Sequence, residues 1–288
     1  VLGLGTTGYG EMLFAKAFQA EYHTVETVAH ARAAKKYVAD ATFILDIGGQ
    51  DMKAMWLDKG IITNILVNEA CSSGCGSFLE NFASSLGIPT KGIEEAAFAS
   101  RHPAVLGSRC TVFMNSSIIT EQRNGRSAED IMAGLCRSII ENVFTKVIRL
   151  SNLDSLGDKI VVQGGTFEND AVLRAMEEYT GREVLRAPYP GLMGAIGMAL
   201  IKKDYEEARK RGDSAGMQAA NDGANAIRKQ QGQKEQHASQ DISNTANRRP
   251  SGSSGNRVTF PSRPSSSGSS GSRGSSIGSY DPSKPQGA

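Results

Sequence analysis

The most informative stretch of this sequence reads Ala41-Thr42-Phe43-Ile44-Leu45-Asp46-Ile47-Gly48-Gly49-Gln50-Asp51. Its opening apolar run, with β-branched and aromatic members, predicts a buried strand, and the two glycines that follow predict a tight turn. Glycines in a turn let backbone N–H groups approach a ligand closely, and Asp46 and Asp51 are placed to hold a hydrated cation. This combination suits a nucleotide phosphate that carries Mg²⁺. The alternative is an ordinary hairpin turn with two solvated acids.

A second turn carries a cysteine. Cys71 follows the next apolar strand, in the run Asn68-Glu69-Ala70-Cys71-Ser72-Ser73-Gly74-Cys75-Gly76-Ser77-Phe78, and Cys110 lies 39 residues further on in a similar polar turn. Two such turns favour a metal centre coupled to nucleotide chemistry, although a lone cysteine is usually a buried small hydrophobe. Cys75 is either a core or phosphate-loop residue or a competing ligand. Cys136 sits beside the apolar stripe of a predicted helix over residues 129–150, so we expect it to pack in the core.

The strand-then-glycine pattern recurs in Val161-Val162-Gln163-Gly164-Gly165-Thr166, which leads into a predicted helix near Asn169. The backbone amides and the positive dipole end of that helix would face the turn. The alternative is a tight strand-to-helix connection without a ligand. Small residues at intervals of three follow at Gly191 and Gly194, a pattern that fits either a helix beside a nucleotide cleft or a plain helix-packing face.

Four separated segments resemble the activator ATPases of 2-hydroxyacyl-CoA dehydratases and benzoyl-CoA reductases, in the order that family has them. They are Asp46 to Lys53, the Cys71 turn, Gly107-Ser108-Arg109-Cys110-Thr111-Val112-Phe113, and Val162-Gln163-Gly164-Gly165-Thr166. The resemblance covers about residues 1 to 202. It implies an α/β, actin-like ATPase fold with two subdomains around a nucleotide cleft.

The resemblance also implies a site that binds ATP or ADP with Mg²⁺. In it, Asp46 would position Mg²⁺ and the attacking water, Gln50 would sense the γ-phosphate, and Asp51 would be the third catalytic residue, while Gly164 and Gly165 would admit the adenosine. The nucleotide-binding residues would be Gly48, Gly49, Gly74, Gly76, Gly164, Gly165, Thr166, Asn169, Gly191 and Gly194.

A [4Fe–4S] cluster is the further implication. Two thiolates per subunit cannot complete its usual four-thiolate shell, whereas two copies related by a two-fold axis can. The resemblance assigns Cys71 and Cys110 as the ligands in such a homodimer. It implies an ATP-driven one-electron donor that activates a 2-hydroxyacyl-CoA dehydratase or a related CoA-ester reductase in anaerobic metabolism. The alternatives are a small-molecule kinase of the same fold, which needs no cysteines, and a nucleotide-dependent scaffold without redox activity.

The composition bounds these functions. The chain has 288 residues, a net charge of +2 and 39% hydrophobic residues, which predicts a soluble globular protein without nucleic-acid or membrane partners. No apolar run approaches the roughly 20 residues that span a bilayer. Four cysteines without a secretory segment favour a reducing, cytoplasmic setting.

Residues 1–203 are expected to form the ATPase domain and residues 204–288 a mostly disordered tail rich in Ser, Gly, Arg and Pro, with a last helix reaching about Arg211. The sequence opens on the end of a strand and a glycine-rich turn, and nothing in it matches the family's first phosphate-binding loop. We therefore expect the domain to be incomplete at its N-terminus and inactive as an ATPase by itself.

Overall fold

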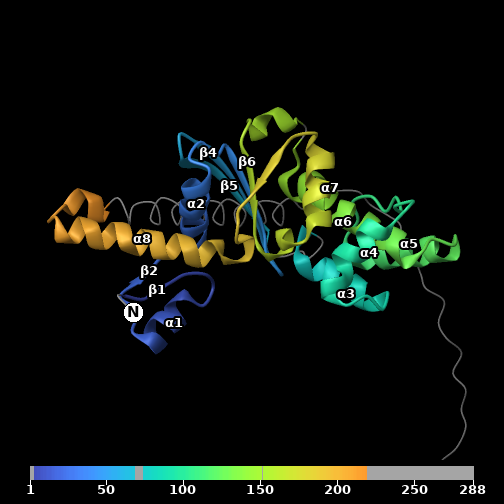
Figure 1. Ribbon diagram of the computed structural model, residues 1–288, viewed down its shortest axis with the longest axis horizontal. Helices are drawn as coiled ribbons and strands as arrows, with labels where there is room; N and C mark the ends of the chain where they lie inside the picture. Colours follow the sequence, from blue (N-terminus) through green and yellow to red (C-terminus); the bar gives the residue numbers. More distant parts are fainter. Residues whose placement is uncertain (1–2, 69–73, 151, 219–288) are drawn as a thin grey trace, which may run out of the picture. The chain divides into compact units, whose positions relative to one another are not determined.

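The computed structural model describes residues 3–68, 74–150 and 152–218. Its strands are β1 (Gly5–Thr6), β2 (Tyr22–His23), β3 (Phe43–Ile47), β4 (Met52–Asp58), β5 (Ile61–Asn68), β6 (Ile160–Gln163) and β7 (Val184–Arg186). Its α-helices are α1 (Glu11–Phe18), α2 (Glu26–Tyr37), α3 (Gly76–Ser85), α4 (Ile93–Ala99), α5 (Thr111–Arg123), α6 (Ala128–Asn142), α7 (Asp170–Thr180) and α8 (Met193–Lys210). Figure 1 shows their arrangement.

One five-stranded sheet organises most of these elements, in the order β5-β4-β3-β6-β7. Strands β3, β6 and β7 run parallel, while β4 and β5 pair antiparallel with their neighbours. All five residues of β3 are buried, as expected for a central strand covered on both faces. The strand predicted from the opening apolar run is confirmed, two residues further along the chain.

Alternating side chains divide this sheet between two apolar layers, because successive residues of a strand point to opposite faces. Phe43, Leu45 and Ile47 belong to the larger core, which α3, α4, α6 and α7 complete. Ile44 belongs to the second core, to which α2 contributes alanines and α8 contributes Met193. Figure 1 shows α3 to α7 on one side of the sheet and α2 with α8 on the other.

The predicted amphipathic helix over residues 129–150 is confirmed in two parts. Helix α6 begins after Ser127, whose side chain accepts a hydrogen bond from the Asp130 N–H at 3.2 Å, a helix N-cap. A π-helical segment, η3 (Val143–Ile148), continues it. The buried stripe includes Ile131, and Cys136 packs there as expected.

The small sheet is formed by β1 and β2, which pair in parallel with α1 between them. Helix α8 ends at Lys210, so the predicted last helix is confirmed. Most of the expected tail, residues 219–288, lies outside the described residues. Of the helices that the structure describes, none combines the length and the apolar character needed to cross a membrane.

Candidate nucleotide site

The two glycine turns meet at the carboxyl ends of neighbouring strands. Strands β3 and β6 pair in parallel, so the Gly48–Gly49 turn after β3 and the Gly164–Gly165 turn after β6 emerge at the same edge of the sheet. Gly164 adopts a φ of +93°, and a Cβ there would lie 2.3 Å from the Ile47 carbonyl oxygen. Only glycine allows both that conformation and that close approach.

Hydrogen bonds to the first turn fix the start of α3. The Gly76 N–H donates to the Gly48 carbonyl at 2.9 Å, and the Ser77 N–H donates to the Gly49 carbonyl at 2.8 Å. The Thr166 hydroxyl, from the second turn, donates to the same Gly48 oxygen at 3.1 Å. The Gly48 carbonyl therefore ties both glycine turns to α3, and it also satisfies an amide that the first turn of a helix leaves without an internal partner.

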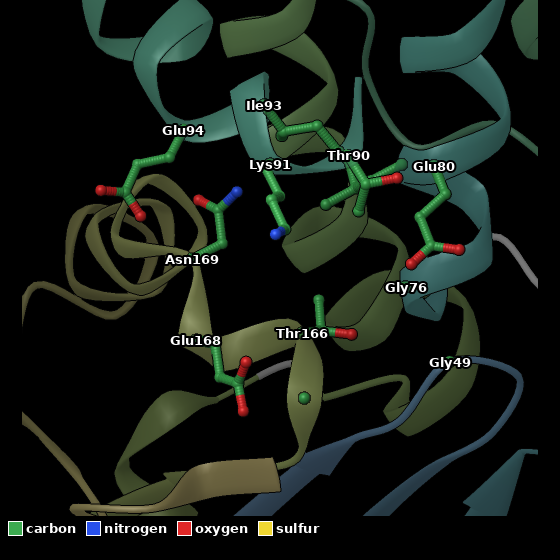
Figure 2. A pocket seen from close by; sticks show the side chains of 12 residues that line it. Gly49, Gly76, Glu80, Thr90, Lys91, Ile93, Glu94, Thr166, Glu168 and Asn169 are labelled. Atoms are coloured by element: carbon green, nitrogen blue, oxygen red, sulfur yellow. The ribbon is translucent and has the colours of Figure 1, made fainter. Parts of the chain in front are cut away.

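A cavity of about 400 Å³ opens beside this junction (Figure 2). Five predicted residues line it, namely Gly49, Gly76, Gly165, Thr166 and Asn169. A Cβ on Gly49 or Gly165 would meet nothing within 4 Å, so both turns face open space. Their backbone is thus accessible to a ligand.

The other side chains around the cavity come from α3, the 3₁₀ helix η2 (Thr90–Gly92), α4 and the 3₁₀ helix η5 (Gly165–Glu168), and the sequence interpretation did not single them out. They include the apolar Leu79 and Ile93 and four charged residues, Glu80, Lys91, Glu94 and Glu168. Figure 2 shows the Lys91 and Thr166 side chains pointing into the space. Apolar walls with three carboxylates and one ammonium suit an uncharged polar group such as a nucleoside better than a bare phosphate.

Side-chain oxygens accept hydrogen bonds from the first backbone amides of α7. The Asn169 Oδ1 accepts hydrogen bonds from the Ala171 N–H at 2.9 Å and the Val172 N–H at 3.3 Å. Glu94 Oε2 accepts from the Asp170 N–H at 2.8 Å. Asn169 thus forms the helix N-cap as well as lining the cavity, and these three amides already have acceptors.

Asp46 lies outside that cavity, in a buried polar cluster on the other face of the sheet. Only 3% of it is exposed, and its carboxylate pairs with His30 Nδ1 and accepts a hydrogen bond from Gln163 Nε2 at 3.1 Å. His30 Nε2 lies 3.3 Å from Glu26 Oε1. The alternative of two solvated acids is therefore wrong for Asp46.

Electrostatics in this cluster stabilise charged side chains. Burial alone would lower the pKa of His30, but the charge and hydrogen bond of Asp46, with those of Glu26, raise that pKa to about 9. The hydrogen bond from His30 outweighs burial and lowers the pKa of Glu26 to about 2. Burial likewise opposes the charge of Lys53, yet its contacts with Asp51 and Glu26 raise its pKa.

A second cavity of about 310 Å³ lies beside Lys53 and Glu26 and is also lined by Tyr9. The Tyr9 hydroxyl donates to Asp51 Oδ2 at 3.4 Å, and the Lys53 ammonium lies 5.8 Å from the centre of the Tyr9 ring. The sequence interpretation assigned no role to Glu26 or His30, which lie four residues apart in α2. Lys53 ends the first segment of the family resemblance, which was the only signal for it.

The remaining predicted residues lie in different surroundings. Gln50 is exposed in the first turn. A Cβ on Gly191 would lie 2.6 Å from Glu168 Oε1, which places Gly191 beside the second turn. Gly74 instead faces the Val143 side chain, and Gly194 faces His30 Nε2, where a Cβ would lie 2.9 Å away. Gly74 and Gly194 therefore pack against other elements and do not line the 400 Å³ cavity.

Of the two predicted cluster ligands, Cys71 lies outside the described residues. Cys110 is exposed at the N-cap of α5. Cys75 and Cys136 are buried in the larger core, and burial raises the pKa of the Cys136 thiol to about 12. Within residues 3–68, 74–150 and 152–218, no three His, Cys, Asp or Glu side chains gather so that they could hold a metal ion.

Glycine turns at the carboxyl ends of adjacent parallel strands, beside a cavity, are typical of nucleotide-binding α/β proteins. Residues 1–201 match the model of the BadF/BadG/BcrA/BcrD ATPase family, and the chain belongs to that family. It is 31% identical over 205 residues to the 2-hydroxyisocaproyl-CoA dehydratase activator of Clostridioides difficile, covering 71% of this chain and 74% of the relative. It is 32% identical over 204 residues to the (R)-2-hydroxyglutaryl-CoA dehydratase activating ATPase of Acidaminococcus fermentans, covering 71% and 75%.

Two solved structures of such relatives are similar to this fold. Component A of the Acidaminococcus fermentans (R)-2-hydroxyglutaryl-CoA dehydratase superposes with a TM-score of 0.63 at 31% identity, covering 69% of this chain and 74% of that one. The Clostridium difficile 2-hydroxyisocaproyl-CoA dehydratase activator with bound ADPNP gives 0.65 at 31% identity, covering 73% and 76%. The predicted actin-like ATPase fold and the family resemblance are confirmed.

Proposed function

We propose that this chain is an ATP-dependent electron donor that activates a 2-hydroxyacyl-CoA dehydratase or a related CoA-ester reductase. The observation that carries the proposal is the junction of the two glycine turns through Gly48 and Gly164, beside the 400 Å³ cavity. Relatives at 31–32% identity are named as dehydratase activators, and one was solved with ADPNP.

The nucleoside end of ATP suits the cavity beside Gly165, where Leu79 and Ile93 supply apolar walls. The phosphates would extend along the Gly48–Gly49 turn toward Asp51 and Gln50. Two cations, His30 and Lys53, face three carboxylates, Glu26, Asp46 and Asp51, in the adjoining cluster. The cluster therefore has an excess of negative charge, which fits a site completed by Mg²⁺. Mg²⁺ would neutralise phosphate charge during hydrolysis.

Cys110 supports the redox half of the proposal. It is the exposed cysteine among those described, it stands at the N-cap position of α5, and its neighbours Val112 and Phe113 expose 78% and 65% of their surface. Exposed apolar side chains beside a thiol fit a subunit interface better than a free surface. Cys110 and Cys71 from each of two subunits would hold a [4Fe–4S] cluster, which supplies the transferred electron.

Anaerobic purification tests both halves together. We expect brown absorbance, about four irons per two chains on the usual cluster stoichiometry, and saturable binding of ADP with Mg²⁺. Cys110→Ser should abolish the iron, while Cys136→Ser, the matched buried control, should keep it. A colourless wild-type protein that still binds nucleotide would favour a small-molecule kinase, and full iron in Cys110→Ser would remove that residue from the ligand set.

A further inference from the structure

A row of polar side chains crosses the sheet beneath α2. Asp46 in β3 is registered with Lys53 in β4 on one side and with Gln163 in β6 on the other. Two residues earlier in their strands, Ile44 and Val161 belong to the apolar core under α2. Because side chains of one strand alternate between faces, Asp46 and Gln163 point to that same face. The apolar layer thus ends in three buried polar residues at the edge where the glycine turns begin.

Helix α2 brings two ionisable side chains onto this row. His30 is 7% exposed, and its two ring nitrogens engage two carboxylates, Nδ1 with Asp46 and Nε2 with Glu26. A ring held at both nitrogens cannot rotate without breaking one of these pairs, and a buried charge left unpaired is costly. The orientation of His30 is therefore fixed from both sides.

Helix α8 closes this arrangement from outside. A Cβ on Gly197 would lie only 1.7 Å from the Ala29 carbonyl oxygen, so α8 approaches α2 more closely than any residue but glycine permits. One turn earlier, Gly194 lies against His30 Nε2. Gly197 therefore allows the close approach of α8 to α2, and Gly194 packs against the His30 ring, which is a helix-packing role for Gly194.

The carboxylate of Asp46 is held through one oxygen. His30 and Gln163 both contact Oδ2, and within the described residues Oδ1 takes part in no hydrogen bond or ion pair. Asp46 is also only two residues before Gly48, whose carbonyl joins the two glycine turns. The cluster thus fixes one oxygen of a carboxylate at the base of the phosphate turn, while the other has no hydrogen bond or ion pair with any described residue.

We propose that His30 is a positioning residue, which orients the Asp46 carboxylate toward the magnesium-nucleotide, and that Glu26 holds the His30 ring in place. This inference rests on the proposed function, since it assigns Asp46 a task at the phosphates. A purely structural ion pair would contribute to folding in the same way, so the test must separate stability from orientation.

The decisive comparison is between His30→Asn and His30→Leu. The Asn amide places a donor near the position of Nδ1 and can still bind Asp46, whereas Leu removes the contact at similar volume. Loss of a partner that orients a metal-binding carboxylate costs about 10- to 100-fold in metal affinity or activity. We expect His30→Leu to lower the apparent Mg²⁺ affinity in ADP binding by that factor, and His30→Asn to recover part of it. Glu26→Gln should give a smaller loss in the same direction.

Met198→Ala provides the matched control, because Met198 is buried with Ala29 in the α2–α8 contact and belongs to a different apolar cluster from Ile44, which lies on the Asp46 face of the sheet. Circular dichroism gives the folded fraction of each variant, and the binding of Mg²⁺ and ADP is expressed per folded protein. The ring N–H signals of His30 in a proton–nitrogen NMR spectrum give a readout independent of turnover, and they should shift when magnesium and ADP are added. Met198→Ala should lower the melting temperature without changing the Mg²⁺ affinity.

Two results would overturn the inference, and they differ from each other. If wild-type protein binds no nucleotide, the proposed function fails and this role fails with it. Wild type could instead bind magnesium-ADP normally while His30→Leu and Met198→Ala have the same Mg²⁺ affinity per folded protein, or while the His30 ring N–H signals do not shift on ligand addition. In either case the proposed function stands and His30 has a structural role only.

Discussion

Replacement of Gly164 by alanine tests the geometry that joins the two glycine turns. Gly164 has φ +93° and ψ 154°, a region of backbone space that only glycine occupies readily. Its new Cβ would also lie 2.3 Å from the oxygen and 2.6 Å from the carbon of the Ile47 carbonyl. Both atoms belong to the backbone of β3, so neither can move aside as the end of a flexible side chain could.

The cost of backbone strain and the cost of steric overlap at position 164 add to an approximate total. A non-glycine residue in this backbone region costs about 1–3 kcal/mol. Forcing a methyl group into a well-packed site costs about 1–3 kcal/mol more. A total of roughly 4 kcal/mol, at about 2–4 °C per kcal/mol for a body of this size, corresponds to a melting temperature lowered by roughly 10 °C.

Gly165→Ala is the matched control, one residue along the same turn. Gly165 has no positive φ, and a Cβ there would meet nothing within 4 Å. An exposed substitution of this kind changes stability by no more than about 0.5 kcal/mol. Thermal unfolding by circular dichroism compares the two variants, and fluorescence titration with a labelled ADP shows whether Gly164→Ala also weakens nucleotide binding.

A Gly164→Ala protein that melts within 2 °C of wild type (about 1 kcal/mol or less) and binds ADP with unchanged affinity would contradict this role of Gly164. Equal destabilisation of Gly165→Ala would also contradict it, since that result would show sensitivity of the whole turn and not of the single contact with Ile47.

Three further outcomes are expected. In protein prepared without iron, iodoacetamide should modify exposed Cys110 and spare Cys136, whose burial raises its pKa to about 12; peptide mass spectrometry showing equal modification would contradict this. The pKa of Glu26 is lowered to about 2 by its hydrogen bond with His30, so its contribution to stability is complete above its unfolded pKa and is lost as the pH falls toward 2. Urea unfolding at several pH values between these limits should therefore show that the free energy of unfolding falls less steeply with decreasing pH in Glu26→Gln than in wild type. Parallel pH profiles of the two proteins would disprove this contribution of Glu26. In a form of the protein that carries the family's first phosphate-binding loop, Asp46→Asn should lower ATP turnover on the order of 10²-fold or more while iron content stays unchanged, and unaltered hydrolysis would remove Asp46 from the mechanism.

Local patterns in the sequence were sufficient for two central strands of this protein and the turns that follow them. The apolar run before Gly48 and the one before Gly164 fix β3 and β6, because a strand needs only a short buried segment and a turn needs only its glycines. The stripe that includes Ile131 fixes α6 for the same kind of reason. The four motif segments added the family, and with it the fold.

Register and packing decided which of these residues meet. Nothing in the local sequence shows that Asp46 is registered with Gln163, because β3 and β6 come from distant segments of the chain. The burial of His30 likewise depends on α8, where Gly194 and Gly197 lie more than 160 positions away along the chain. Tertiary contacts bring a glutamate, a histidine and a lysine, none of which the sequence interpretation assigned to the site, into one charged cluster behind the phosphate turn. The sequence alone could predict the loops of the site, while tertiary packing determined the support behind them.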